Sequence, residues 1–108
     1  MVVELLWWAG CPSTDRALAE LREALVELEL DDVRVRVSEI ATDDEAQAVG
    51  FAGSPTILIN GADIVAHNVE EQIGLSCRVY TRRDGRVSPT PDPADLRDAL
   101  RRAAALRR

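Results

Sequence analysis

The stretch VVELLWWAGCPSTDRALAELREALVELEL, residues 2–30, decides the fold of this chain. Residues 2–8 are apolar at every position except Glu4, which is typical of a strand covered on both faces and central in its sheet. Over residues 15–30, leucines recur three or four positions apart and predict an amphipathic helix. They are Leu18, Leu21, Leu25 and Leu28. The chain therefore opens with a strand, a turn that contains Cys11, and a helix.

A second strand and a second helix follow. Over residues 33–37, valine alternates with arginine, which is the pattern of a strand with one solvated face near an edge of the sheet. Two strands joined through a helix form a crossover unit, so we expect the first two strands to be parallel. Thr42 and Glu45 form a capping box ahead of a short helix, and Gly50 is placed to end it.

The rest of the chain predicts two more strands and a last helix. Residues 56–60 and 77–81 have strand character, and residues 61–76 between them read as a loop with a helical turn around 70–73. Asp92 is placed to cap the last helix, which has Pro93 at its first position. Its buried stripe is predicted to be Leu96, Ala99, Leu100 and Ala103.

The element order is thus β-α-β-α-β-β-α, which predicts an α/β fold with a single mixed sheet of about four strands and helices on both faces. Its 108 residues, 46% of them hydrophobic, suit one globular domain over residues 1–108. No apolar run approaches the ~20 residues that a membrane span needs, so we expect no membrane partner. The start of the chain lacks the pattern of a secretory leader, which favours a cytoplasmic location.

Charge and cysteine usage exclude other classes. Thirteen basic residues, all arginine, face 19 acidic ones for a net charge of -6, which argues against a nucleic-acid partner. Two cysteines are too few for a disulfide framework. The sequence has no zinc-spaced cluster and no glycine-rich phosphate loop, so it predicts neither a bound metal nor a cofactor.

Three features together resemble the thioredoxin superfamily, and the resemblance covers most of the chain. They are the turn Trp8-Ala9-Gly10-Cys11-Pro12-Ser13-Thr14, the sequence Gly53-Ser54-Pro55-Thr56 before the third strand, and the element order. The resemblance implies a reactive Cys11. It also implies a cis-proline turn at Ser54-Pro55, packed against that cysteine and offering backbone groups to a substrate's disulfide. An aromatic side chain, here that of Trp7 or Trp8, is expected to cover the cysteine.

The chemistry of Cys11 follows from its place at the start of a helix. Unpaired N–H groups and the positive end of the helix dipole there favour the thiolate and lower its pKa. Pro12 costs no hydrogen bond in the first turn, and Ser13 and Thr14 can turn their hydroxyls toward the sulfur. The alternative is that Cys11 is a buried residue acting as a small apolar group.

Thr14 stands where thioredoxin-like proteins carry a second cysteine. Cys11 therefore cannot close a local disulfide, which predicts a single nucleophilic thiol that forms mixed disulfides with a thiol or disulfide substrate, small molecule or protein. Cys77 shares one face of its predicted strand with Val79 and Thr81, and this alternation favours a core cysteine. The other interpretation places Cys77 beside Cys11 as a resolving thiol or second soft-metal ligand.

Two functions compete with thiol–disulfide exchange. One is a binding module that kept the fold without redox activity. The other rests on a narrower resemblance, carried by Cys11-Pro12, Gly53-Ser54-Pro55-Thr56 and Cys77-Arg78-Val79-Tyr80, to small bacterial thioredoxin-like proteins named with alkylmercury lyases. That resemblance implies soft-metal or organomercurial handling by the two cysteines, with Asp15 as the proton donor. The alternative is that Asp15 only complements the helix dipole. For His67 and the basic run over residues 82–86 we expect simple solvent exposure.

Overall fold

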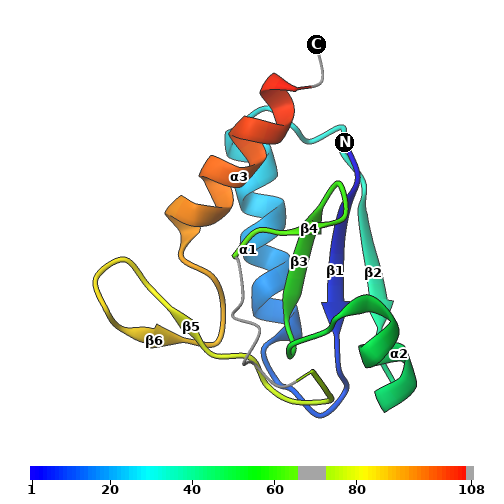
Figure 1. The fold of residues 1–108 in the computed structure, drawn as a ribbon. Coiled ribbons are helices and arrows are strands. Elements are labelled where there is room, and N and C mark those ends of the chain that lie inside the picture. The colour runs from blue at the N-terminus through cyan, green and yellow to red at the C-terminus, as the bar shows by residue number, and fades with distance from the viewer. Residues whose placement is uncertain (66–72, 107–108) are drawn as a thin grey trace.

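The computed structural model of the chain describes residues 1–65 and 73–106 (Figure 1). Its elements, in order, are β1 (Val3–Trp7), α1 (Thr14–Glu27), β2 (Val35–Glu39), α2 (Asp43–Val49), β3 (Thr56–Ile59), β4 (Ala62–Asp63), β5 (Tyr80–Thr81), β6 (Val87–Ser88) and α3 (Pro93–Ala105). His67 and most of the helical turn expected around residues 70–73 lie outside the described residues. Within the described part of the chain, no helix is both long and apolar enough to cross a bilayer.

Four of these strands form one mixed sheet in the order β2-β1-β3-β4. The first strand is central, as predicted: β1 runs parallel to β2 with Val3 opposite Val35, and antiparallel to β3 with Leu5 opposite Ile57. β2 lies at one edge, which also confirms its prediction. The arrangement is a mixed α/β fold, compatible with the thioredoxin-like architecture expected from the element order.

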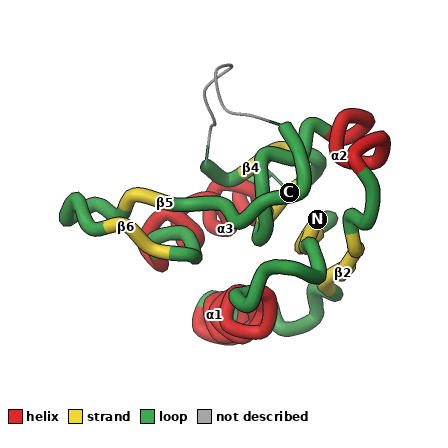
Figure 2. Tube along the Cα trace, turned by 90° about the horizontal axis from the view of Figure 1, so that it is seen from below, coloured by secondary structure: helices red, strands yellow, loops and turns green. Residues whose placement is uncertain are grey.

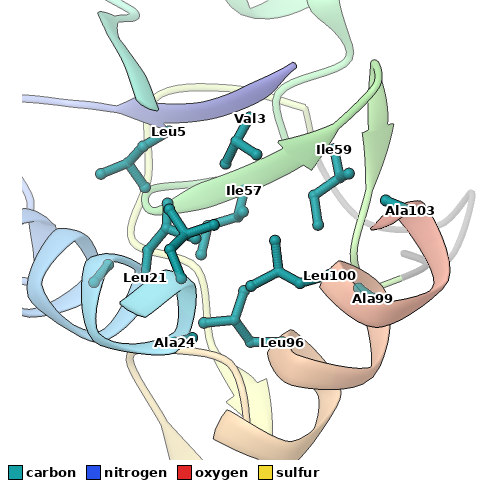
Figure 3. Close-up of a cluster of buried hydrophobic side chains, with 12 residues drawn as sticks. Val3, Leu5, Leu21, Ala24, Ile57, Ile59, Leu96, Ala99, Leu100 and Ala103 are labelled. Carbon is teal, nitrogen blue, oxygen red and sulfur yellow. The ribbon is translucent and has the colours of Figure 1, made fainter. Parts of the chain in front are cut away.

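Helices cover both faces of this sheet (Figure 2). On one face, alternate residues of β1 and β3 pack against α1 and α3 around the fully buried Leu21 and Leu100 (Figure 3). On the other face, Leu6 packs with Ala46 of α2 and with Phe51, which follows that helix. The predicted stripe of α3 is buried at all four positions: Leu96, Ala99, Leu100 and Ala103.

The helix ends form as the sequence predicts. The backbone N–H of Glu45 donates to Thr42 Oγ1 at 3.1 Å, and Gly50 ends α2 with a φ of 69°. Asp92 accepts a hydrogen bond from the backbone N–H of Ala94, and Pro93 is the first residue of α3. These local signals fix the start of α3 and both ends of α2, and Gly50 leads the chain from α2 toward Ser54-Pro55.

The strand predicted over residues 77–81 is wrong in two respects. The fourth strand of the sheet is β4, whereas only Tyr80–Thr81 of the predicted strand is extended, in a separate hairpin with Val87–Ser88. The face of this segment that was predicted to be buried is also the exposed one. Cys77, Val79 and Thr81 do share a face, but that face is exposed, and Arg78 and Tyr80 are buried instead.

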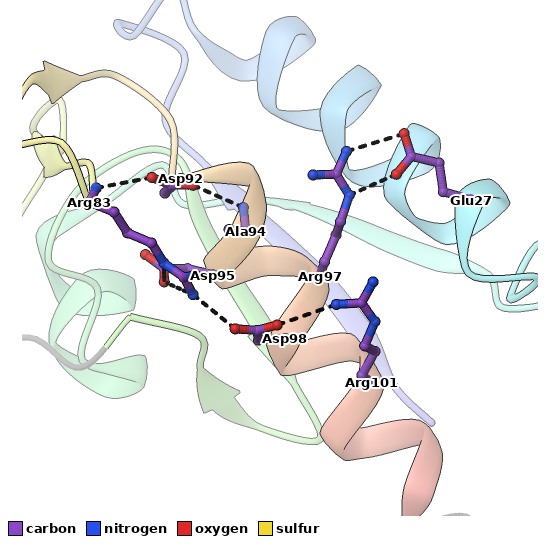
Figure 4. Close-up of polar contacts among 8 residues, drawn as sticks. All are labelled: Glu27, Arg83, Asp92, Ala94, Asp95, Arg97, Asp98 and Arg101. Atoms are coloured by element: carbon purple, nitrogen blue, oxygen red, sulfur yellow. Dashed lines mark hydrogen bonds and ion pairs between the residues drawn. The ribbon is translucent and has the colours of Figure 1, made fainter.

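The tip of this hairpin is tied to α3 (Figure 4). The backbone N–H of Arg83 donates to Asp92, and its guanidinium pairs with Asp95 at 2.7 Å and with Asp98 at 2.8 Å. Arg83 is exposed, as expected of its basic run, and it also forms ion pairs with the last helix. Exposed ion pairs contribute little stability, but these contacts fix the course of the chain between Cys77 and α3.

Candidate functional site

Cys11 lies in the turn between β1 and α1, and only 7% of its surface is exposed. Its backbone N–H donates to the carbonyl of Trp8 at 3.0 Å. Ser13 is the N-cap of α1, but its side chain accepts no capping hydrogen bond from the helix. Cys11 therefore lies at the start of the helix, as predicted. Its small exposed fraction means that little of the residue is open to solvent.

Trp8 supports this turn. Its indole lies over Gly10, where an added Cβ would clash with carbons of the ring. The ring also packs against the cluster around Phe51. Trp8 is half-buried and stacks on the residue just before Cys11.

The Ser54-Pro55 peptide bond is cis, which confirms that prediction. Ser54 is fully buried, and the thiol of Cys11 donates to its carbonyl oxygen, with 3.3 Å between Sγ and O. Ser54 Oγ accepts the backbone N–H of Trp8 at 3.0 Å. The proline turn thus contacts both the sulfur and the end of β1 that precedes it.

The segment that carries Cys77 pairs with the same turn. Ser54 and Cys77 form a parallel β-bridge, in which the Ser54 N–H donates to the carbonyl of Ser76 and the Arg78 N–H donates to the carbonyl of Ser54, both at 2.8 Å. This pairing places Cys77 near Cys11. Both cysteines are free, and Cys77 is exposed. The prediction of a core Cys77 is therefore wrong, and the alternative placement beside Cys11 is correct.

A buried arginine holds this segment in place. Arg78 is 6% exposed, and its guanidinium pairs with Asp63 at 2.6 Å and donates to the carbonyl of Val65 at 2.9 Å. It also donates to Thr56 Oγ1 at 3.2 Å. Because a buried charge needs such partners, the fork of Arg78 fixes the residues around it to β3 and β4.

Tyr80 completes the anchor. Its ring lies under the Arg78 guanidinium, 4.6 Å from centroid to Cζ, and its hydroxyl donates to the carbonyl of Pro55. The residues on both sides of Cys77 are therefore tied to the cis-proline turn. The anchoring roles of Arg78, Asp63 and Tyr80 could not be predicted from the sequence, because their partners lie far away along the chain.

The surroundings of the two thiols shift their pKa values in opposite directions. Burial raises the pKa of Cys11, but hydrogen bonds from the Ser13 N–H and from the Cys77, Ser54 and Ser13 side chains outweigh it and lower the pKa overall. The pKa of Cys77 is raised, first by its hydrogen bond to Cys11 and then by burial. Cys11 is thus the sulfur that ionises first.

We expect Cys77→Ala to raise the pKa of Cys11, because the variant loses a side chain that donates to the thiolate. The pH at which Cys11 alkylation reaches half its maximal rate should move up, and the rate at neutral pH should fall several-fold. The rate is measured with iodoacetamide in the tryptic peptide 1–16, which contains Cys11 but not Cys77. Cys77→Ser keeps a hydroxyl donor and is the matched control. Unchanged profiles in the alanine variant would contradict the assignment of Cys77 as a donor.

The remaining residues that were predicted to act beside Cys11 differ in their exposure and in their contacts. Pro12 is exposed, and Ser13 directs its backbone and side chain to the Cys11 sulfur. The hydroxyl oxygen of Thr14 is instead buried without a hydrogen-bond partner in the described structure, so its predicted contact with the sulfur is wrong. Asp15 is exposed. Over residues 1–65 and 73–106, no three or more His, Cys, Asp or Glu side chains cluster as a metal site would require.

Comparison with known proteins identifies a family for this chain. No curated protein and no solved structure matches the chain. A family described as a domain of unknown function, DUF2703, matches residues 9–92, a range that includes Cys11, the cis-proline turn and Cys77. The chain belongs to the DUF2703 family.

Proposed function

We propose that this protein catalyses thiol–disulfide exchange with Cys11 and Cys77 as its redox pair. One observation carries the proposal: two free thiols, far apart in sequence, meet at a cis-proline turn, and the pKa of one of them is lowered. Thr14 rules out a pair within the first turn of α1. Cys77 supplies the second thiol from across the fold.

The two cysteine thiols supply both electrons that the exchange with a substrate disulfide requires. A substrate disulfide accepts two electrons and is released as two thiols, while Cys11 and Cys77 lose them and form one disulfide. A disulfide requires Cα atoms within about 7 Å of each other and well-aligned Cβ atoms. The Ser54–Cys77 pairing and the contact of the Cys11 sulfur with Ser54 place the two cysteines near each other, which supports formation of a disulfide.

The test is the oxidation product. Treatment of the reduced protein with glutathione disulfide should give a species lighter by two hydrogen atoms, with tryptic peptides 1–16 and 37–78 joined through Cys11 and Cys77. Cys11→Ser and Cys77→Ser should each give only glutathione adducts. If the wild-type protein also gives adducts and no bridge, the dithiol proposal is wrong and a monothiol protein remains. Thiols that do not react at all would instead favour a non-catalytic binding module.

The adjacency of the two sulfurs also supports a second candidate, the handling of a soft metal ion or an organomercurial as substrate. Thiolates prefer soft ions, and two of them can hold one ion between them. This candidate predicts stoichiometric binding of Hg(II) that is lost in Cys77→Ser. Binding unaffected by that substitution would exclude a two-sulfur site.

A further inference from the structure

Resting on the proposed exchange, we infer that an incoming thiol forms its bond with Cys77, and that Cys11 is the inner sulfur that is released and later returns. This assignment reverses the roles expected from the sequence, in which Cys11 meets the substrate directly. It also implies a small-molecule thiol or disulfide as the substrate class.

The two cysteines differ in how much of each residue is exposed to solvent. Cys77 lies on the solvent side of its segment, between the exposed Ser76 and the exposed Val79, whereas Cys11 is 7% exposed. A thiolate must approach one sulfur of a disulfide directly, so access decides which sulfur it attacks. Once Cys11 and Cys77 are joined, the sulfur open to solvent is that of Cys77.

The backbone beside Cys11 is already occupied. A protein substrate that binds as an added strand needs unpaired N–H and C=O groups at the edge it joins. At Ser54, both groups are paired, one with Ser76 and the other with Arg78. An extended peptide therefore cannot pair beside Cys11 unless residues 76–78 are displaced. A small thiol needs no such pairing and reaches Cys77 from solvent.

The leaving group favours the same direction. The incoming thiolate forms a new S–S bond with Cys77, the bond between Cys77 and Cys11 breaks, and its electron pair stays on Cys11. Ser13 and Ser54 still donate hydrogen bonds to the resulting Cys11 thiolate, and a thiolate stabilised in this way is a better leaving group. In the reverse step, the Cys11 thiolate attacks Cys77 and expels the small thiolate.

The experiment uses the oxidised wild-type protein and reduced glutathione. The reaction is stopped with acid at early times, free thiols are alkylated, and tryptic peptides are mapped. We expect glutathione on peptide 37–78 and alkylated Cys11 in peptide 1–16, with an excess of about tenfold over the opposite pattern. Cys11→Ser, which cannot form the bridge, is treated with glutathione disulfide instead and should form and retain the Cys77 adduct, because the returning thiolate is missing.

The outcomes are distinct. If the protein forms no disulfide between Cys11 and Cys77, the proposed function is wrong and this inference falls with it. If the bridge forms but glutathione appears equally or mainly on peptide 1–16, the exchange stands and the present inference is overturned. Reduction of insulin by the protein as fast as reduction of glutathione disulfide would overturn the assignment of a small-molecule substrate.

Discussion

Replacing Arg78 with methionine is expected to lower the free energy of unfolding by about 3–5 kcal/mol, the usual result of removing one partner of a buried ion pair. Methionine keeps the apolar stem of the side chain but leaves the Asp63 carboxylate without its cation. The carbonyl of Val65 and the hydroxyl of Thr56 lose their donor as well. Urea unfolding followed by circular dichroism measures the change.

The same substitution should also weaken the redox pair. Arg78 is adjacent to Cys77, so losing its anchor frees the residues that hold the two sulfurs together. We expect the equilibrium constant for bridge formation against glutathione to fall by about tenfold, which corresponds to about 1.4 kcal/mol. A purely structural role would lower stability without moving this constant in the molecules that remain folded.

Two variants serve as controls for Arg78. Asp63→Asn in the Arg78→Met background removes the uncompensated charge and should recover part of the lost stability. Arg78→Lys keeps the charge but lacks the planar fork that reaches Asp63 and Val65 together, so it should restore stability only in part. A methionine variant as stable as the wild type would contradict the anchoring role of Arg78.

The parts of the fold that the sequence predicts well are those with local causes. The capping box of Thr42 and Glu45 and the stripe of α3 depend on neighbours within one or two helical turns, and both form as expected. The cis bond before Pro55 is implied by the resemblance to the thioredoxin superfamily and is present. For the capping box and the stripe, the signal and the structure lie within the same short stretch of chain.

Cys77 could not be placed correctly because its surroundings depend on distant residues. The alternation over residues 77–81 separates the two faces, but hydrophobicity alone puts Cys77 and Val79 inside. Arg78 is buried instead, since Asp63 lies opposite it, 15 residues away in the chain. A single sequence does not reveal which carboxylate a buried arginine will meet. β4 is only two residues long, and its position at the edge of the sheet could not be predicted for the same reason.

Gly53→Ala is expected to lower the free energy of unfolding by about 2–4 kcal/mol, because it adds backbone strain and a steric clash at one position. Gly53 has a φ of 132°, where residues with a side chain rarely lie. A Cβ there would stand 2.9 Å from the Cβ of Arg78 and 3.0 Å from its Cα and N. Those atoms belong to the segment that carries Cys77, so relief of the clash must move that segment away from the proline turn.

Gly61→Ala is the matched control for this clash. Gly61 also has a positive φ, 83°, but an added Cβ would meet no atom within 4 Å, so its cost should be the backbone strain alone, about 1–2 kcal/mol. The two variants should differ further in redox behaviour, because only Gly53 touches the residues around Cys77. We therefore expect Gly53→Ala to slow bridge formation between Cys11 and Cys77, and Gly61→Ala to leave it unchanged. Equal rates of bridge formation in the two variants would mean that close contact between Gly53 and Arg78 is not what keeps the two sulfurs together.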